Sequence, residues 1–239
     1  MADASRKRKA GDGTDQSGGR KSPRAAAELE PEPEPEGGGG EGEQGKRVWL
    51  VRHAESENNV SKRTFRSTFG SGRLPATRAE WVSVGQLPLV RMDTPLSAHG
   101  RRQAEAQRAV LDAADFVARE RPELVLHSPL VRARDTCLTL FGGLEGGGPA
   151  VEQFDELYER SISEHLWRSW LQPRVARFTA HLLSRPERRI VAVGHSSFFE
   201  EMCGAVMGNV SVWCATLSAE GQWRDVTLLH DTPADIHEA

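Results

Sequence analysis

The sequence predicts an α/β fold of three layers, in which helices cover both faces of a mostly parallel sheet. From residue 47 onward, short apolar runs typical of buried strands alternate with segments of helical periodicity. Several of these apolar runs end in polar residues, as strands do in open parallel sheets. The last apolar segment, residues 211–230, is divided at Glu220 and Gly221, which predicts a C-terminal hairpin and therefore an antiparallel edge.

The elements follow one another in a regular order. We expect strands at residues 47–51, 123–129, 150–154 and in the first part of 188–208, and helices at 97–119, 130–141, 164–183 and in the second part of 188–208. Ser97 is the expected N-cap of its helix, because a serine side chain can accept a hydrogen bond from a backbone N–H of the first turn. Pro173 must start, kink or interrupt the helix in which it lies.

The first 46 residues differ from the rest in composition. They are almost free of large apolar residues and rich in Gly, Pro, Glu, Lys and Arg, which predicts a disordered tail (1–46) before a single folded domain (47–239). Within the tail, "RKRK" at 6–9 and the basic pair at 20–21 resemble a bipartite nuclear localisation signal. A nuclear import receptor is the expected partner, with a solubilising arm as the alternative, so we expect a cytoplasmic protein, a nuclear protein or both.

Other partners and locations are disfavoured by what the sequence lacks. No apolar run approaches the roughly 18 residues of a membrane span, and the N-terminus has no apolar signal segment. Cys137, Cys203 and Cys214 are widely scattered, which suits a reducing compartment and fits neither a disulfide framework nor a zinc site. The basic block of the tail has no interleaved aromatic residues, which argues against direct binding of nucleic acid.

Charged side chains gather at the ends of three predicted strands. Arg52 and His53 end the first strand, Arg132 follows the second, and His195 follows the fourth. Because the carboxyl ends of parallel strands lie at one edge of a sheet, these residues are expected to share a pocket. Arginine offers a planar fork of donors that matches phosphate oxygens, and arginines beside a metal site would repel the cation. The set therefore predicts a phosphate site without a metal.

Such a site suits phosphoryl transfer. A histidine can take the phosphoryl group from an ester and so divide one difficult displacement into two easier ones. Preorganised donors must hold the charge that develops on the phosphoryl oxygens. The leaving alkoxide needs a proton, so we expect a carboxyl group with a raised pKa nearby.

Five segments of the chain carry a resemblance to a known family. In this order and at these spacings they resemble the histidine phosphatase superfamily, in its phosphoglycerate mutase-like branch: "LVRHAESENN", "DTPLSAHGRRQAEA", "HSPLVRARDTC", "ELYER" and "VAVGHSSF". The resemblance spans nearly all of residues 47–231 and implies the same three-layer α/β/α fold. It also implies that a histidine is phosphorylated during turnover.

The resemblance assigns roles to six residues. It implies that His53, Glu159 and His195 are catalytic and that Arg52, Asn59 and Arg132 bind phosphate. His53 is the residue that takes the phosphoryl group, and Glu159 is the proton donor, with Glu156 as its close rival. Asn58 replaces Asn59 if the loop is shifted. Ala54 stands where the family commonly has a glycine, which is a small-for-small change.

We therefore expect a metal-independent phosphomonoester phosphatase that needs no cofactor and acts on a phosphorylated small molecule or a phosphoprotein. A phosphoglycerate mutase-type phosphotransferase is the first alternative, and a non-catalytic phosphate-binding or scaffold protein is the second. Residues 60–95 form a basic insert after the first motif. A loop of this charge above the pocket could recognise a second anionic group on the substrate.

Overall fold

A computed structural model describes residues 45–69, 93–143, 148–159 and 170–233. Nearly all of the predicted tail lies outside these residues, although Lys46 already belongs to the first strand. The described strands are β1 (Lys46–Arg52), β2 (Leu124–His127), β3 (Ala150–Gln153), β4 (Arg189–Gly194), β5 (Val212–Leu217) and β6 (Trp223–His230). The described helices are α1 (Glu57–Phe69), α3 (Ala98–Ala113), α4 (Phe116–Glu120), α5 (Val131–Phe141), the 3₁₀ helix η1 (Asp155–Leu157), α7 (Gln172–Ser184) and α8 (Ser196–Cys203).

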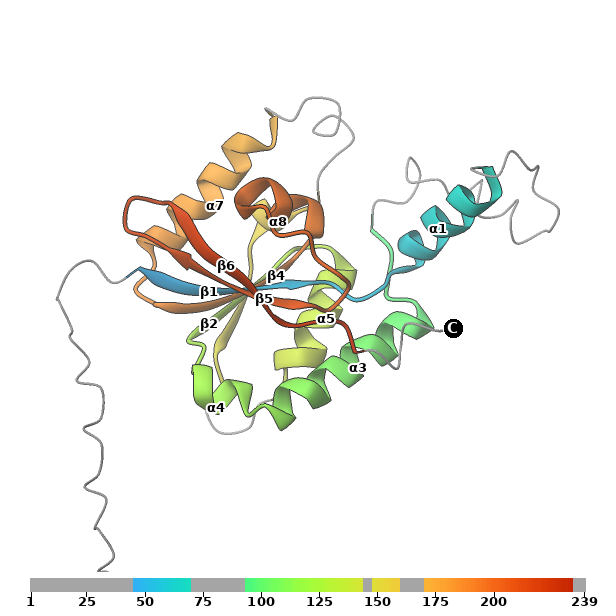
Figure 1. Cartoon of the computed structure of the whole chain (residues 1–239), viewed down its shortest axis with the longest axis horizontal. Helices are drawn as coiled ribbons and strands as arrows, with labels where there is room; N and C mark the ends of the chain where they lie inside the picture. Colours follow the sequence, from blue (N-terminus) through green and yellow to red (C-terminus); the bar gives the residue numbers. More distant parts are fainter. Residues whose placement is uncertain (1–44, 70–92, 144–147, 160–169, 234–239) are drawn as a thin grey trace, which may run out of the picture. The chain divides into compact units, whose positions relative to one another are not determined.

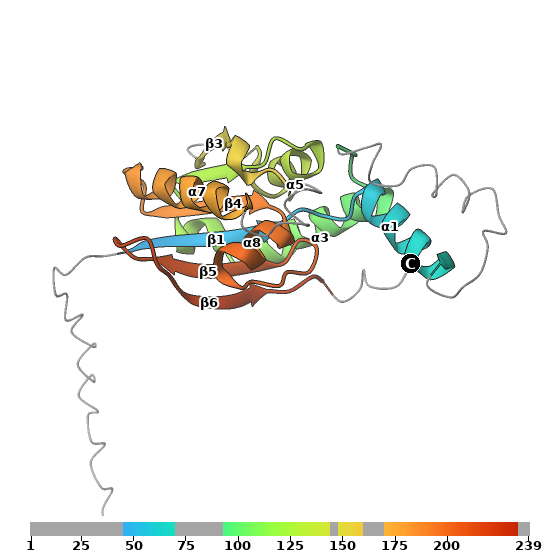
Figure 2. The same cartoon turned by 90° about the horizontal axis from the view of Figure 1, so that it is seen from above.

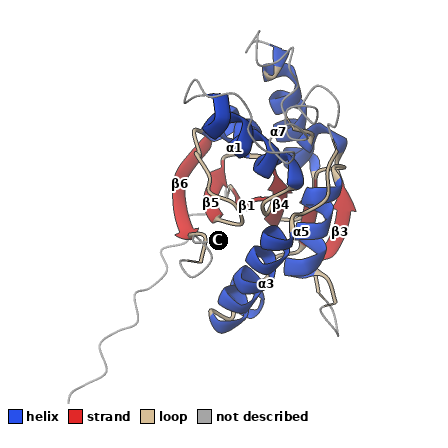
Figure 3. Cartoon of the chain, turned by 90° about the vertical axis from the view of Figure 1, so that its right-hand side faces the viewer, coloured by secondary structure: helices blue, strands red, loops and turns tan. Residues whose placement is uncertain are grey.

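The strands that the structure describes form one mixed sheet in the order β3-β2-β4-β1-β5-β6. Strands β3, β2, β4 and β1 are parallel, β5 pairs with β1 in the antiparallel sense, and β6 closes the C-terminal hairpin. Figure 3 shows the sheet from its end, with β6 at one edge and β3 at the other. The predicted parallel sheet with an antiparallel edge is thus confirmed.

Helices cover both faces of the sheet, which confirms the three layers. Along β1, Val48 and Leu50 face the apolar cluster that includes α7 and α8, whereas Trp49 and Val51 face the cluster of α3, α4 and α5. Figure 1 shows α7 and α8 on one side of the strands and α3 and α4 on the other. All four side chains are fully buried, as expected of a central strand with apolar neighbours on both faces.

The predicted helix at 97–119 begins as expected but is divided in two. Ser97 is its N-cap, and the Ser97 hydroxyl oxygen accepts a hydrogen bond from the backbone N–H of Gly100. Helix α3 ends at Ala113, however, because Asp115 takes a left-handed backbone conformation with φ of 51°. An aspartate adopts this conformation more readily than most residues, and it interrupts the helical hydrogen bonds before α4 begins.

Two further helices differ in extent from what we expected. Pro173 lies in the first turn of α7, so it starts this helix, and residues 164–169 of the predicted helix lie outside the described residues. The basic insert is helical in part, because α1 runs to Phe69, while residues 70–92 lie outside the described residues. Figures 1 and 2 show α1 leading from the carboxyl end of β1 away from the sheet.

Within the described part of the chain, none of the helices combines the length and hydropathy that a membrane span requires.

Candidate active site

The site is built at the carboxyl end of β1, which lies between β4 and β5 in the middle of the sheet. The backbone N–H of His53 donates to the carbonyl of Gly194 at 3.0 Å, which ties the end of β1 to the end of β4. On the other side, Asn209 Nδ2 donates to the carbonyl of His53 at 2.8 Å. His53 is therefore held from both neighbouring segments.

The two histidines expected to share a pocket lie side by side. The ring centroids of His53 and His195 are 5.0 Å apart, with an angle of 60° between the ring planes. Only 3% of His53 and 1% of His195 is exposed. Two adjacent parallel strands place them there, because His53 directly follows β1 and His195 directly follows β4.

His53 is neutral, and its hydrogen bonding fixes which nitrogen is free. Burial lowers the pKa of His53 well below its ordinary value, and the positive charges of Arg132 and Arg52 lower this pKa further. The Nδ1 atom is 2.7 Å from the carbonyl oxygen of Ala54, so Nδ1 carries the proton and donates. The lone pair of Nε2 is then available as a nucleophile.

Arg132 and Glu159 meet at the same site. Arg132 is 1% exposed, and its Nη2 donates to Glu159 Oε2 in a charge-assisted hydrogen bond. Lys62 Nζ, from α1, lies 4.0 Å from the other oxygen of Glu159. Glu156, the rival proton donor, instead pairs with Arg177 in an exposed hydrogen bond. The structure thus places Glu159, and not Glu156, beside the arginine expected to bind phosphate.

The other two predicted phosphate ligands, Arg52 and Asn59, have different hydrogen-bond partners. Arg52 Nη1 donates to the carbonyl of Met207 at 2.7 Å, and burial lowers the pKa of the guanidinium, which stays protonated at neutral pH. The side-chain oxygen of Asn59 accepts from both the backbone N–H and the hydroxyl of Ser56. Asn59 therefore caps the start of α1, and its role as a phosphate ligand stays a prediction, as does that of the buried Asn58.

Three residues that the sequence did not single out hold the site together. The hydroxyl of Thr136 accepts from the N–H of Ala54 and donates to the carbonyl of Arg132, so it couples the nucleophile loop to α5. Ser128 Oγ lies 2.9 Å from Nε2 of His195, and Asn209 holds the carbonyl of His53. Thr136 could have been found from its spacing, because it lies four residues after Arg132 on one helix face.

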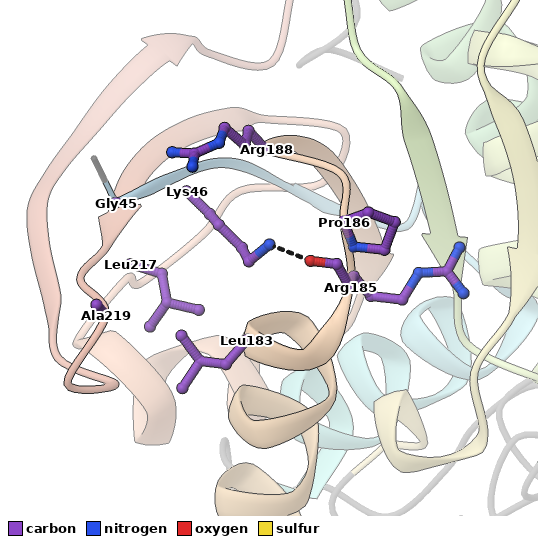
Figure 4. Close-up of a pocket in the computed structure, with 8 residues that line it drawn as sticks. All are labelled: Gly45, Lys46, Leu183, Arg185, Pro186, Arg188, Leu217 and Ala219. Carbon is purple, nitrogen blue, oxygen red and sulfur yellow. Dashed lines mark hydrogen bonds between the residues drawn. The ribbon is translucent and has the colours of Figure 1, made fainter. Parts of the chain in front are cut away.

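The chain has a further cavity away from this site. It has a volume of about 390 Å³, and it lies at the amino end of β1, lined by Lys46, Leu183, Arg188 and Leu217 among others (Figure 4). Lys46 Nζ donates to the carbonyls of Arg185 and Glu187, so the ammonium group binds backbone oxygens just beyond the C-terminal end of α7. The histidine pair lies at the opposite end of this strand.

A metal site was the alternative interpretation of the paired histidines. Within the described ranges, no three His, Cys, Asp or Glu side chains are grouped so that they could hold a metal ion. The candidate site contains two histidines and one nearby carboxylate, but it also contains two arginines. Whether the reaction proceeds without a metal stays a prediction.

A family comparison agrees with this arrangement. The family model described as the histidine phosphatase superfamily (branch 1) matches residues 78–170, which include Arg132 and Glu159. Over these residues the chain is similar to the histidine phosphatase superfamily. No match was found among curated proteins.

Solved structures show the same fold at low sequence identity. The protein YhfR of Bacillus stearothermophilus is 16% identical, with a TM-score of 0.52, and the match covers 80% of this chain and 99% of YhfR. A candidate alpha-ribazole-5'-P phosphatase of Escherichia coli is 18% identical, with a TM-score of 0.50 over 80% of this chain and all of the other. A protein described as mycobacterial hydrolase 2 is 19% identical, with a TM-score of 0.50 over 81% and 95% of the two chains.

Two buried neutral histidines should make the stability of this protein sensitive to mild acid. Below about pH 6.5, the ordinary pKa of histidine, the unfolded chain takes up protons that the folded chain does not. The free energy of unfolding therefore keeps its full value above that pH. It decreases as the pH falls from 6.5 toward the lowered pKa values of the two histidines in the folded state. Each histidine contributes up to about 1.4 kcal/mol of lost stability per pH unit.

The measurement is urea unfolding at several pH values between 7.5 and 5. The double variant His53→Gln, His195→Gln is expected to lose less unfolding free energy across this range than the wild type. The single variants should lie between them. Parallel curves for the wild type and the double variant would contradict the assignment of both histidines as neutral.

Proposed function

We propose that the protein is a phosphomonoester phosphatase that works without a metal or cofactor, through a phosphohistidine intermediate on His53. One observation carries the proposal. The ring of the buried, neutral His53 lies 5.0 Å from the ring of His195, measured between centroids, and the positive charges of Arg132 and Arg52 lower the pKa of His53. A nucleophile that is already unprotonated, beside cations that can hold a phosphoryl group, is what phosphoryl transfer requires.

In the first step, Nε2 of His53 attacks phosphorus in line with the ester oxygen. The new P–N bond forms as the P–O bond to the leaving group breaks. Once the phosphoryl group has replaced Glu159 as the partner of Arg132, the Glu159 carboxylate takes up a proton from solvent and gives it to the departing oxygen. Arg132 and Arg52 hold the charge on the three phosphoryl oxygens, because guanidinium groups offer donors in a geometry that matches them.

In the second step, water hydrolyses the phosphoenzyme. The Glu159 carboxylate takes a proton from a water molecule whose oxygen attacks phosphorus. The P–N bond breaks and its electron pair returns to Nε2, so that neutral His53 is restored and inorganic phosphate leaves. The position of Glu159 beside Arg132 supports both roles, because the arginine proposed to hold the phosphoryl group keeps this carboxyl group close to it.

The test is a panel of phosphate esters assayed in the presence of a metal chelator, with sugar phosphates, phosphoglycerate-like acids, nucleotides and phosphopeptides. We expect the wild type to release inorganic phosphate from at least one class and His53→Ala to release none. An acid-labile, base-stable phosphoryl group should be trapped on the wild type alone. Equal turnover by both proteins would exclude this mechanism.

The panel also separates the alternatives. A mutase would give an isomeric phosphate ester rather than inorganic phosphate from a phosphoglycerate-like acid. A phosphate-binding or scaffold protein would bind inorganic phosphate and turn over no ester of any class. The proposal favours the phosphatase, because the nucleophile, the second histidine, the arginines and a carboxyl group are all found in one site.

We propose in addition that the basic clusters at residues 6–9 and 20–21 bind a nuclear import receptor. Deletion of residues 1–40 is expected to move a fluorescently tagged protein from the nucleus to the cytoplasm. Because the remaining residues 41–239 form a compact unit of their own, kcat/KM should change by less than about twofold. An unchanged nuclear fraction would instead favour a solubilising arm.

A further inference from the structure

Ser128 lies where two strands of the sheet end together. It directly follows β2 and is fully buried, and its backbone N–H donates to the carbonyl of Val193 on β4 at 3.0 Å. Its Oγ lies 2.9 Å from Nε2 of His195. The hydroxyl is thus fixed next to one of the two ring nitrogens of a buried histidine.

The other contact of this hydroxyl indicates where its proton lies. The backbone N–H of Leu130 donates to Ser128 Oγ at 3.3 Å. The hydroxyl also has one proton to donate, and among the described residues Nε2 of His195 is the acceptor that lies within hydrogen-bond distance of it. Because a buried hydroxyl proton without an acceptor is costly, Ser128 Oγ is the donor and Nε2 the acceptor. A histidine that accepts at Nε2 carries its single proton on Nδ1.

His195 has only one proton to place. Burial lowers its pKa well below the ordinary value, and the nearby His53 and Arg132 lower it further. Nδ1 of His195 is buried and has no hydrogen-bond partner among the described residues. A buried donor without a partner is costly unless a ligand satisfies it. With Nε2 occupied by Ser128, Nδ1 is the atom left to contact a bound group.

We propose that Ser128 is a positioning residue, which keeps the proton of His195 on Nδ1 so that this N–H can donate to a phosphoryl oxygen. The inference rests on the proposed function for the identity of that group, but the tautomer itself does not. With the other tautomer, a nitrogen lone pair would face the phosphoryl oxygens and repel them. By accepting a hydrogen bond from the Ser128 hydroxyl at Nε2, His195 keeps an N–H at Nδ1 that can donate to an anion.

The first measurement is the tautomer of His195 in the free protein, read from the nitrogen resonances of ¹⁵N-labelled histidine. We expect an Nδ1–H tautomer in the wild type and in Ser128→Thr, which keeps the hydroxyl. In Ser128→Ala, the Nε2–H form should appear. The second measurement is the affinity for orthovanadate, expected to fall about tenfold in Ser128→Ala, the equivalent of one net hydrogen bond, and to stay near the wild-type value in Ser128→Thr.

Ser211→Ala is the matched control, because Ser211 is also buried but its hydroxyl donates to the carbonyl of Gly208. It should leave the tautomer of His195 unchanged. Thermal unfolding of each variant shows whether it is folded, since Ser128→Ala also leaves the N–H of Leu130 without its acceptor. A proton on Nε2 in the wild type, or an unchanged tautomer in folded Ser128→Ala, would overturn the inference. If the tautomer is as expected but no ester is hydrolysed, the proposed function fails and the positioning role stands.

Discussion

The variant His53→Ala is expected to lose at least about ten-thousand-fold in kcat against the best ester of the panel. Removal of the covalent nucleophile is among the most costly single changes in enzymes of this kind, and what remains is binding and charge stabilisation alone. Nothing else in the described site can replace it. His195 is 5.0 Å away between ring centroids, and its Nε2 is occupied by the hydroxyl of Ser128.

The loss should lie in the chemical step and not in folding or binding. His53→Ala is therefore measured by kcat, by the affinity for inorganic phosphate and by the yield of trapped phosphoenzyme. We expect phosphate to bind the variant, because Arg132 and Arg52 are retained, while the trapped phosphoryl group disappears. Imidazole added to the buffer should restore part of the activity if it enters the space left by the ring.

The matched control is His230→Gln, which removes a histidine at the far edge of the sheet. His230 ends β6 and is half-buried, and it is paired in register with Val212. Its kcat should stay within about twofold of the wild type, as expected of a change away from the site. An equal loss in both variants would show that the effect of His53→Ala comes from a general defect.

The chemistry of the site could be read largely from the ends of the strands. An apolar run that ends in Arg52 and His53 places both at the edge of the sheet, and a second strand that ends in His195 brings the rings together. This inference needs only the rule that parallel strands share a direction. The fold followed from the same alternation of strands and helices.

What the sequence could not decide depends on the direction of side chains. Glu156 and Glu159 are both plausible proton donors by spacing, and only the turn at η1 directs Glu159 to Arg132 and Glu156 to Arg177. Likewise, the division of the helix at Asp115 depends on a single left-handed residue. Such local choices are made by tertiary contacts rather than by periodicity.

The roles of Ser128 and Asn209 could not be predicted from the sequence for a different reason. Both are small polar residues in loops, and their sequence context gives no signal of these contacts. Their roles depend on partners 67 and 156 residues away in the chain, His195 and His53. Contacts at such separations are set by the topology of the sheet.

The second large effect is expected for Arg132, whose replacement by lysine should lower kcat/KM by about a hundredfold to a thousandfold. A lysine keeps the charge but loses the planar fork that meets two phosphoryl oxygens at once. Arg132→Ala should be worse, because Arg132 is almost fully buried and its loss also leaves Glu159 without its closest partner. The inhibition constant of inorganic phosphate should rise in parallel with the loss of kcat/KM.

Arg134→Ala separates a loss of phosphate binding from a loss of charge on the helix. Arg134 lies on the same helix, but it is exposed and pairs with its neighbour Asp135, so kcat/KM and the inhibition constant should stay within about twofold. If the variants of Arg132 and Arg134 behaved alike, the arginine of the buried site would not be the phosphate ligand. If Arg132→Lys kept full activity, a point charge would suffice, and the bidentate geometry proposed for this guanidinium would be wrong.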